Sequence, residues 1–143
     1  MQAIYVTELK STCLIASKRS YIGYLPAIIL SVVVAVLSLW ENPEMPASVP
    51  MNDKWLHGLM YTLLAVVWMV PSSRQFSEVS IPIRTRVLYY IYVCAGVTFY
   101  GGLMEVLQRY CTVTRSGEMA DLYADGIGAV IGVAIVYLFR KKQ

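Results

Sequence analysis

Charged residues are scarce in this sequence. Only 15% of the 143 residues are charged and 57% are hydrophobic, whereas a soluble domain has about 25% charged and about 45–50% apolar residues. This composition excludes a disordered chain, which needs low hydrophobicity and high charge. Three cysteines, an odd number, exclude a small disulfide-stapled protein, and six prolines with nine glycines exclude a low-complexity or collagen-like chain. A membrane protein or an unusually apolar soluble protein remains.

Long uncharged stretches separate the few charged residues. They cover residues 21–40, 55–73 (broken only by His57), 87–104 and 126–139. A 20-residue helix is about 30 Å long, which matches the hydrocarbon thickness of a bilayer. In lipid such a segment must satisfy its own backbone hydrogen bonds, so we expect helices. The segments of about ten alternating residues that build a membrane β-barrel are absent from the sequence.

These stretches predict an all-α membrane protein with four transmembrane helices in a compact bundle. The predicted spans are about 21–40, 54–71, 85–109 and 121–139, within a single domain of residues 1–143. Pro71 is expected to end the second span, and residues 1–20 are expected to form a cytoplasmic lead. A soluble helical bundle is the alternative, but it would need a polar stripe on each helix, and residues 28–39 and 130–138 show little polarity on any face.

Lysine and arginine are unevenly distributed around these spans. Nine lie on the side of the two termini and the second loop, and three, Lys54, Arg109 and Arg115, lie on the other side. Because basic segments stay in the cytoplasm, both termini are predicted to be cytoplasmic. The net charge of +3 then reflects the orientation of the protein in the membrane. The sequence shows no basic helix face that would bind nucleic acid. Lys18 and Arg19 before an apolar run also resemble a signal peptide, but no clear cleavage site follows, so we expect an uncleaved anchor.

This topology brings most of the other ionisable residues to the outer membrane face. The second and fourth spans begin there, and the third span ends there. Asp53, His57 and Tyr61 follow at i, i+4 and i+8 on one helix face. Ionisable groups at membrane depth usually face protein or water, which makes them candidates for a functional site. The candidate binding residues are Asp53, Lys54, His57, Tyr61, Glu105, Gln108, Arg109, Arg115, Asp121 and Asp125.

Several of these residues also have a purely structural explanation. Asp53 could cap the second span, and Glu105 could pair with Arg109 on the surface of one helix. Gly128 and Gly132, at i and i+4, let another helix approach closely. Packing within the chain is the expected use of this glycine pair, so an oligomer is possible but a monomer is favoured.

A metal is not expected from the sequence. No local spacing of a zinc motif, no P-loop and no nucleophile elbow is present. A divalent cation such as Mg²⁺, Ca²⁺ or Mn²⁺ would suit an oxygen-rich set drawn from separate helices. The ligands would be His57, Glu105, Asp121 and Asp125. Because the sequence contains no local metal-binding motif, we expect no metal and no other cofactor.

Two segments of the sequence resemble the VanZ-like family of bacterial membrane proteins. Residues 52–61 are similar to the family segment D-K-x-x-H-x-x-x-Y. The second half is similar to the family pattern G-x-x-x-E-x-x-Q, then R, then D-x-x-x-N-x-x-G. The matching residues are Gly101, Glu105, Gln108, Arg115, Asp121, Asp125 and Gly128. The resemblance covers roughly residues 52–132, and both patterns fall at the expected ends of the spans.

The resemblance implies a multi-pass protein of the bacterial inner membrane, linked to the cell envelope. The family is named for a role in resistance to the glycopeptide teicoplanin, which brings no settled biochemical activity. One position departs from the pattern, because this chain has Asp125 where the family often has Asn. The extra carboxylate near Asp121 means that the role of this position does not carry over directly.

Two functions compete for the outer polar residues. In the first, the residues form an outward-facing polar pocket that binds an anionic headgroup of a membrane lipid, such as a lipid-linked cell-wall intermediate. Lys54, Arg109 and Arg115 would hold its phosphate, because guanidinium groups contact phosphate oxygens two at a time. In the second, the protein is a hydrolase or transferase acting on such a phosphate, with His57, Glu105 and Asp125 as catalytic acid and base groups.

A small ion- or proton-coupled transporter is a third possibility. The sequence argues against it, because the spans lack ionisable residues below Tyr61 that would relay a charge across the bilayer.

Overall fold

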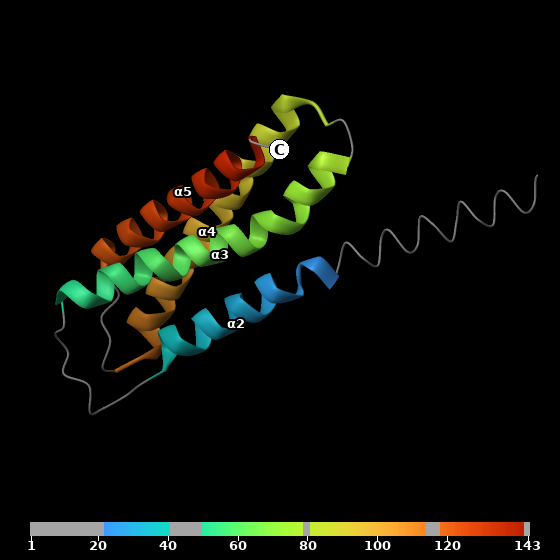
Figure 1. Ribbon diagram of the computed structural model, residues 1–143. Coiled ribbons are helices and arrows are strands. Elements are labelled where there is room, and N and C mark those ends of the chain that lie inside the picture. The colour runs from blue at the N-terminus through green and yellow to red at the C-terminus, as the bar shows by residue number, and fades with distance from the viewer. Residues whose placement is uncertain (1–21, 41–49, 79–80, 114–117, 142–143) are drawn as a thin grey trace, which may run out of the picture.

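The structure, a computed structural model, describes residues 22–40, 50–78, 81–113 and 118–141, with residues 50–53, 74–78 and 141 described by their backbone alone. The described part of the chain is all-α, as the sequence predicted. Figure 1 shows its four helices packed side by side. They are α2 (Leu25–Leu39), α3 (Pro50–Glu78), α4 (Ile83–Cys111) and α5 (Met119–Lys141).

Three helices are long and apolar enough to cross a membrane. The candidate spans are Lys54–Ser73 in α3, Ile83–Cys111 in α4 and Met119–Arg140 in α5. They indicate a multi-pass membrane protein, and they lie within a few residues of the second, third and fourth predicted spans. The first predicted span is shorter in the structure, because α2 has 15 residues. At 1.5 Å per residue α2 is about 22 Å long, so a fourth span stays a prediction.

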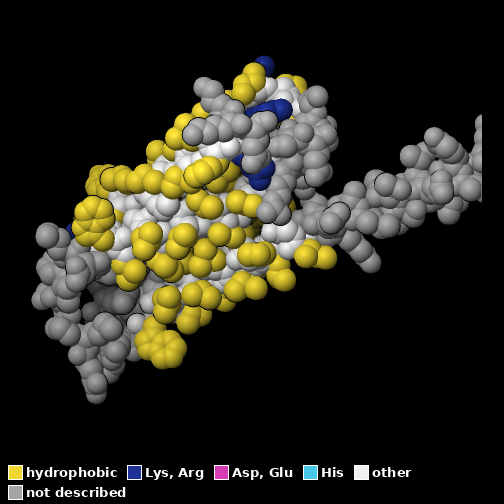
Figure 2. Space-filling view, viewed as in Figure 1, with side chains coloured by type: hydrophobic (Ala, Val, Ile, Leu, Met, Phe, Trp, Pro, Cys, Tyr) yellow, Lys and Arg dark blue, Asp and Glu magenta, His cyan; other side chains and the backbone are white. Residues whose placement is uncertain are grey.

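Apolar side chains cover the outside of the helices. Figure 2 shows them along the bundle on the face in view, where no Asp, Glu or His side chain of the described residues is visible. Ile29, Phe99 and Ile127, from three different helices, are each more than half exposed. Soluble proteins rarely expose contiguous apolar surface of this extent. The apolar surface is therefore more typical of a protein in contact with lipid than of a soluble helical bundle.

The closest helix pair is α3 and α5, which run in the same direction. A methyl group on Gly128 would collide with the carbonyl oxygen of Gly58, and one on Gly132 would lie 2.5 Å from the carbonyl oxygen of Thr62. The Thr62 hydroxyl is also 3.0 Å from the carbonyl oxygen of Gly128, within hydrogen-bonding distance. Small residues at this spacing let helices pack closely in lipid. The chain's own α3 therefore occupies the glycine face of α5.

Polar side chains attach α2 to the rest of the bundle. The Tyr100 hydroxyl donates to the carbonyl oxygen of Ser31 at 2.6 Å, and the Trp68 indole N–H donates to the Ser31 hydroxyl at 3.2 Å. Near the other end of α2, the Gln108 amide donates to the carbonyl oxygen of Ser38 at 2.9 Å. These bonds link α2 to α3 and α4, although only three of the α2 residues are buried.

Pro71 does not end α3, although the candidate span in this helix ends at Ser73, two residues beyond the predicted end. The helix continues to Glu78 with Pro71 inside it. Proline removes a backbone N–H and crowds the preceding turn, but serine side chains and neighbouring helices compensate for this in membrane helices. The missing N–H of Pro71 leaves the carbonyl of Val67 without its usual donor, and the Ser73 hydroxyl donates to the nearby carbonyl oxygen of Val70 at 2.9 Å. Gly23 leaves room for the ring, since a Cβ there would lie 3.3 Å from Pro71 Cβ.

The first turn of α3 also differs from the expected cap. The helix begins at Pro50, so Asp53 lies inside the first turn and does not cap the helix. Proline suits the first helical position, because an N–H there would have no partner within the helix.

Candidate functional site

Four helix ends meet at one end of the bundle. They are the last turn of α2, the first turns of α3 and α5, and the last turn of α4, at the left in Figure 1. We call this the polar end. For α3, α4 and α5, these are the helix ends that the predicted topology places on one membrane face.

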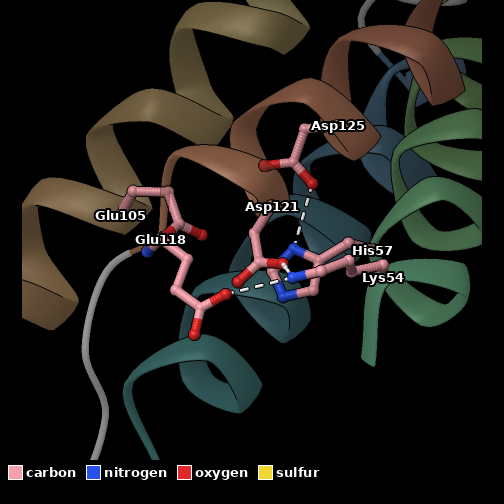
Figure 3. Close-up of polar contacts among 6 residues, drawn as sticks. All are labelled: Lys54, His57, Glu105, Glu118, Asp121 and Asp125. Atoms are coloured by element: carbon pink, nitrogen blue, oxygen red, sulfur yellow. Dashed lines mark hydrogen bonds and ion pairs between the residues drawn. The ribbon is translucent and has the colours of Figure 1, made fainter. Parts of the chain in front are cut away.

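An exposed ion-pair group lies at the rim of the polar end. Lys54 Nζ is 3.0 Å from Glu118 Oε2 and 3.2 Å from Asp121 Oδ1 (Figure 3). The side chains of Lys54 and Glu118 are 39% and 55% exposed, and exposed ion pairs of this kind stabilise a fold only slightly. The two carboxylates offset the charge of Lys54, so Lys54 brings no surplus positive charge to the site.

A second, buried group lies next to this rim. His57 of α3, Glu105 of α4 and Asp125 of α5 converge there (Figure 3), and we call these three residues the buried centre. His57 Nδ1 is 3.0 Å from Asp125 Oδ1. One nitrogen or oxygen atom from each of the three residues lies within 4.8 Å of the other two. Three candidate residues from distant parts of the sequence thus share one small volume.

Helix periodicity explains why the rim and the buried centre are neighbours. Lys54 and His57 are three residues apart in α3, and Asp121 and Asp125 are four apart in α5. Residues at these spacings share one helix face. Because α3 and α5 run in parallel, Lys54 meets Asp121, and one turn further along His57 meets Asp125.

Gly101 of α4 provides the space for Asp125. A Cβ at Gly101 would lie 2.5 Å from Asp125 Oδ2 and 3.0 Å from Asp125 Cβ. The helix continues through this glycine with ordinary helical geometry. The absent side chain therefore lets α4 accept a carboxylate from α5.

Three buried oxygens in this region have no hydrogen-bond partner among the described residues. They are the Tyr61 hydroxyl, Glu105 Oε1 and Asp125 Oδ2. The side chain of Asp125 is fully buried, and Tyr61 and Glu105 are 2% and 8% exposed. The Tyr61 ring also stacks on His57, with centroids 6.3 Å apart. Because buried polar atoms are nearly always bonded, such a concentration of exceptions marks this region as a candidate site for a bound group.

The remaining contacts of Glu105 and Gln108 are structural. Glu105 Oε2 accepts a hydrogen bond of 2.8 Å from the backbone N–H of Glu118, which holds the start of α5 against α4. Gln108 is buried and donates to Ser38 of α2, so it links two helices and lies apart from the buried centre.

The remaining candidates are Arg109, Arg115 and Asp53. Arg109 is exposed in the last turn of α4, where a cation interacts favourably with the helix dipole. No ion pair joins Arg109 to Glu105 within the part of the chain that the structure describes, so the surface pair suggested for them is not formed there. Arg115 lies outside the described residues, and Asp53 is described by its backbone alone.

Two residues of the site were not among the sequence candidates. Glu118 pairs with Lys54 and bonds Glu105 through its backbone. Asp121 begins the fourth predicted span, and Glu118 precedes it by three residues. This spacing would have identified Glu118 as a candidate. Gly101 appeared only as part of a family pattern, and its spatial role towards Asp125 follows from three-dimensional packing alone.

Comparison with protein-family models, curated proteins and solved structures finds no match. Evidence about function therefore comes from the structure alone. The described residues form an all-α chain with three candidate spans and a cluster of ionisable side chains at one end.

Proposed function

We propose that this chain is a VanZ-like, multi-pass protein of the bacterial inner membrane that binds an anionic, lipid-linked headgroup of the cell envelope. In this proposal all four described helices span the membrane, both termini are cytoplasmic and the polar end faces outward. The resemblance links such a protein to resistance to teicoplanin. The observation that carries the proposal is the convergence of ionisable side chains from α3, α4 and α5 at one end of an otherwise apolar bundle.

The distribution of basic residues supports this orientation. Arg84 and Arg86 lie in the first turn of α4, and Arg140 lies at the end of α5. These helix ends are opposite the polar end, and Figure 2 shows most of the visible Lys and Arg surface on their side of the bundle. An excess of basic residues beside membrane spans is typical of the cytoplasmic side.

Arg109 is the described residue best placed to meet a phosphate. It is exposed at the polar end, whereas Lys54 is already bound by two carboxylates. A guanidinium group forms two parallel hydrogen bonds to phosphate oxygens and remains charged at any physiological pH. Headgroups carried on lipid would approach Arg109 laterally from the membrane surface.

Arg109→Ala is expected to weaken binding of a polyisoprenyl phosphate about tenfold, because a charge-assisted bond contributes about 1.5 kcal/mol or more. Binding can be measured by native mass spectrometry on the purified protein. Arg84→Ala is the matched control, since Arg84 is equally exposed at the opposite end of the same helix. Equal affinities for the wild type and Arg109→Ala would contradict the proposal.

An enzyme acting on the same headgroup is the second candidate, and the buried centre favours it. The pairing of His57 with Asp125, and the nearby Glu105, is an arrangement suited to general acid and base catalysis. If this function holds, incubation with a labelled polyisoprenyl diphosphate releases phosphate, and His57→Ala lowers the rate at least a hundredfold, since general acid–base groups contribute about 10²–10⁴. Unaltered lipid after incubation with the wild type would exclude it.

A further inference from the structure

We propose that His57, Glu105 and Asp125 bind one divalent metal ion of the Mn²⁺ type. This goes beyond headgroup binding and departs from the sequence expectation of no metal. It also stands independently of the proposed function, because the residues that carry it are defined by their own geometry.

The donor atoms have nearly the spacing that a metal requires. Ligand atoms bound at about 2.2 Å lie at most about 4.4 Å apart. The three donors of the buried centre lie within 4.8 Å of one another, so side-chain movements that bring them closer together would let all three reach one ion. One imidazole and two carboxylates form the mixed nitrogen and oxygen set that suits Mn²⁺ and related divalent ions.

The unbonded oxygens are an independent observation that indicates a ligand. Glu105 Oε1 and Asp125 Oδ2 are buried, and neither has a hydrogen-bond partner among the described residues. Two carboxylates in one buried volume repel each other when both are ionised, so one must bind a proton or a cation must join them. A divalent ion would satisfy both free oxygens at once.

No described Lys or Arg side chain neutralises these carboxylates. Lys54 is held at the rim by Glu118 and Asp121, and the described ion pairs include no Lys or Arg bound to Glu105 or Asp125. The His57 side chain keeps 12% of its surface exposed, so one member of the buried centre reaches the protein surface. Asp125 bonds His57 through one oxygen, and its other oxygen has no hydrogen-bond partner among the described residues.

A bound divalent ion would also supply positive charge at the polar end, where the described acidic residues outnumber Lys54. Under the proposed function, this charge would attract the phosphate of a headgroup. The metal site itself does not require that function.

The test is a titration of the full-length protein with Mn²⁺ in nanodiscs of phosphatidylcholine alone, after chelator treatment and removal of the chelator. Free Mn²⁺ is followed by electron paramagnetic resonance. We expect one saturable site per chain, and at least tenfold weaker binding in Asp125→Asn and in Glu105→Gln. Glu78→Gln is the control, because Glu78 ends α3 at the opposite end of the bundle from the polar end, and the Mn²⁺ affinity of this variant should stay within twofold of the wild type.

Thermal unfolding without metal verifies that the variants fold. Asp125→Asn removes a buried charge, so its melting temperature without Mn²⁺ should equal or exceed that of the wild type, whereas the rise in melting temperature on adding Mn²⁺ should disappear. Absence of saturable binding, or equal affinities for the wild type, Asp125→Asn and Glu105→Gln, would overturn the metal site. Because the titration uses neutral lipid, its failure is distinct from a failure of polyisoprenyl phosphate to bind.

Discussion

Gly128→Ala is expected to lower the free energy of unfolding by about 3 kcal/mol, the upper part of the range for overpacked cores. The added methyl group would collide with the carbonyl oxygen of Gly58, which belongs to the α3 backbone and cannot rotate away. Relief requires α3 and α5 to separate, which also weakens the contact between the Thr62 hydroxyl and Gly128. Denaturation of the detergent-solubilised protein with sodium dodecyl sulfate, followed by circular dichroism, measures the loss.

Gly96→Ala is the matched control for this experiment. Gly96 lies within α4, and apart from the adjacent stretch of its own helix no atom of the described residues lies within 4 Å of the position that a Cβ would occupy. Alanine favours a helix by about 1 kcal/mol over glycine, so this variant should be as stable as the wild type or slightly more stable. If Gly128→Ala and Gly96→Ala unfold at the same detergent concentration, the close packing of α3 on α5 does not stabilise the fold.

The helices were predictable because the hydrophobic signal is local. Uncharged runs placed the last three spans within a few residues of α3, α4 and α5, since a spanning segment needs both length and an absence of charge. Pro71 was misread for the same reason. Its effect on α3 depends on contacts with Ser73 and Gly23, and such contacts are not visible in a sequence pattern.

The site was predictable only as a group of residues at one end. Helical spacing placed His57 and Asp125 on faces that could meet, but it could not assign partners among several carboxylates. The register between α3 and α5 makes that choice, because Gly128 packs against Gly58 and so aligns His57 with Asp125. The same register directs Lys54 to the rim carboxylates, and for this reason the proposed function assigns the phosphate contact to Arg109 rather than to Lys54.

His57→Ala is expected to lower the free energy of unfolding by about 2–3 kcal/mol when metal is removed with a chelator, because it leaves a buried carboxylate without its partner. Asp125 has no exposed surface, and one of its oxygens already lacks a hydrogen-bond partner among the described residues. Lys54→Ala is the contrast, since it breaks one exposed ion pair with Glu118 and one with the buried Asp121, and it should cost less than His57→Ala because the Lys54 side chain is itself 39% exposed. Detergent denaturation again measures both variants.

A double-mutant cycle separates this pairing from the cavity that His57→Ala also creates. In an Asp125→Asn background the buried charge is gone, so the same His57→Ala change should cost at least about 1 kcal/mol less than in the wild type. The cavity is the same in both backgrounds and cancels in the difference. Identical costs would mean that the imidazole contributes only by filling space, and the His57–Asp125 contact could then orient neither a proton nor a metal ion.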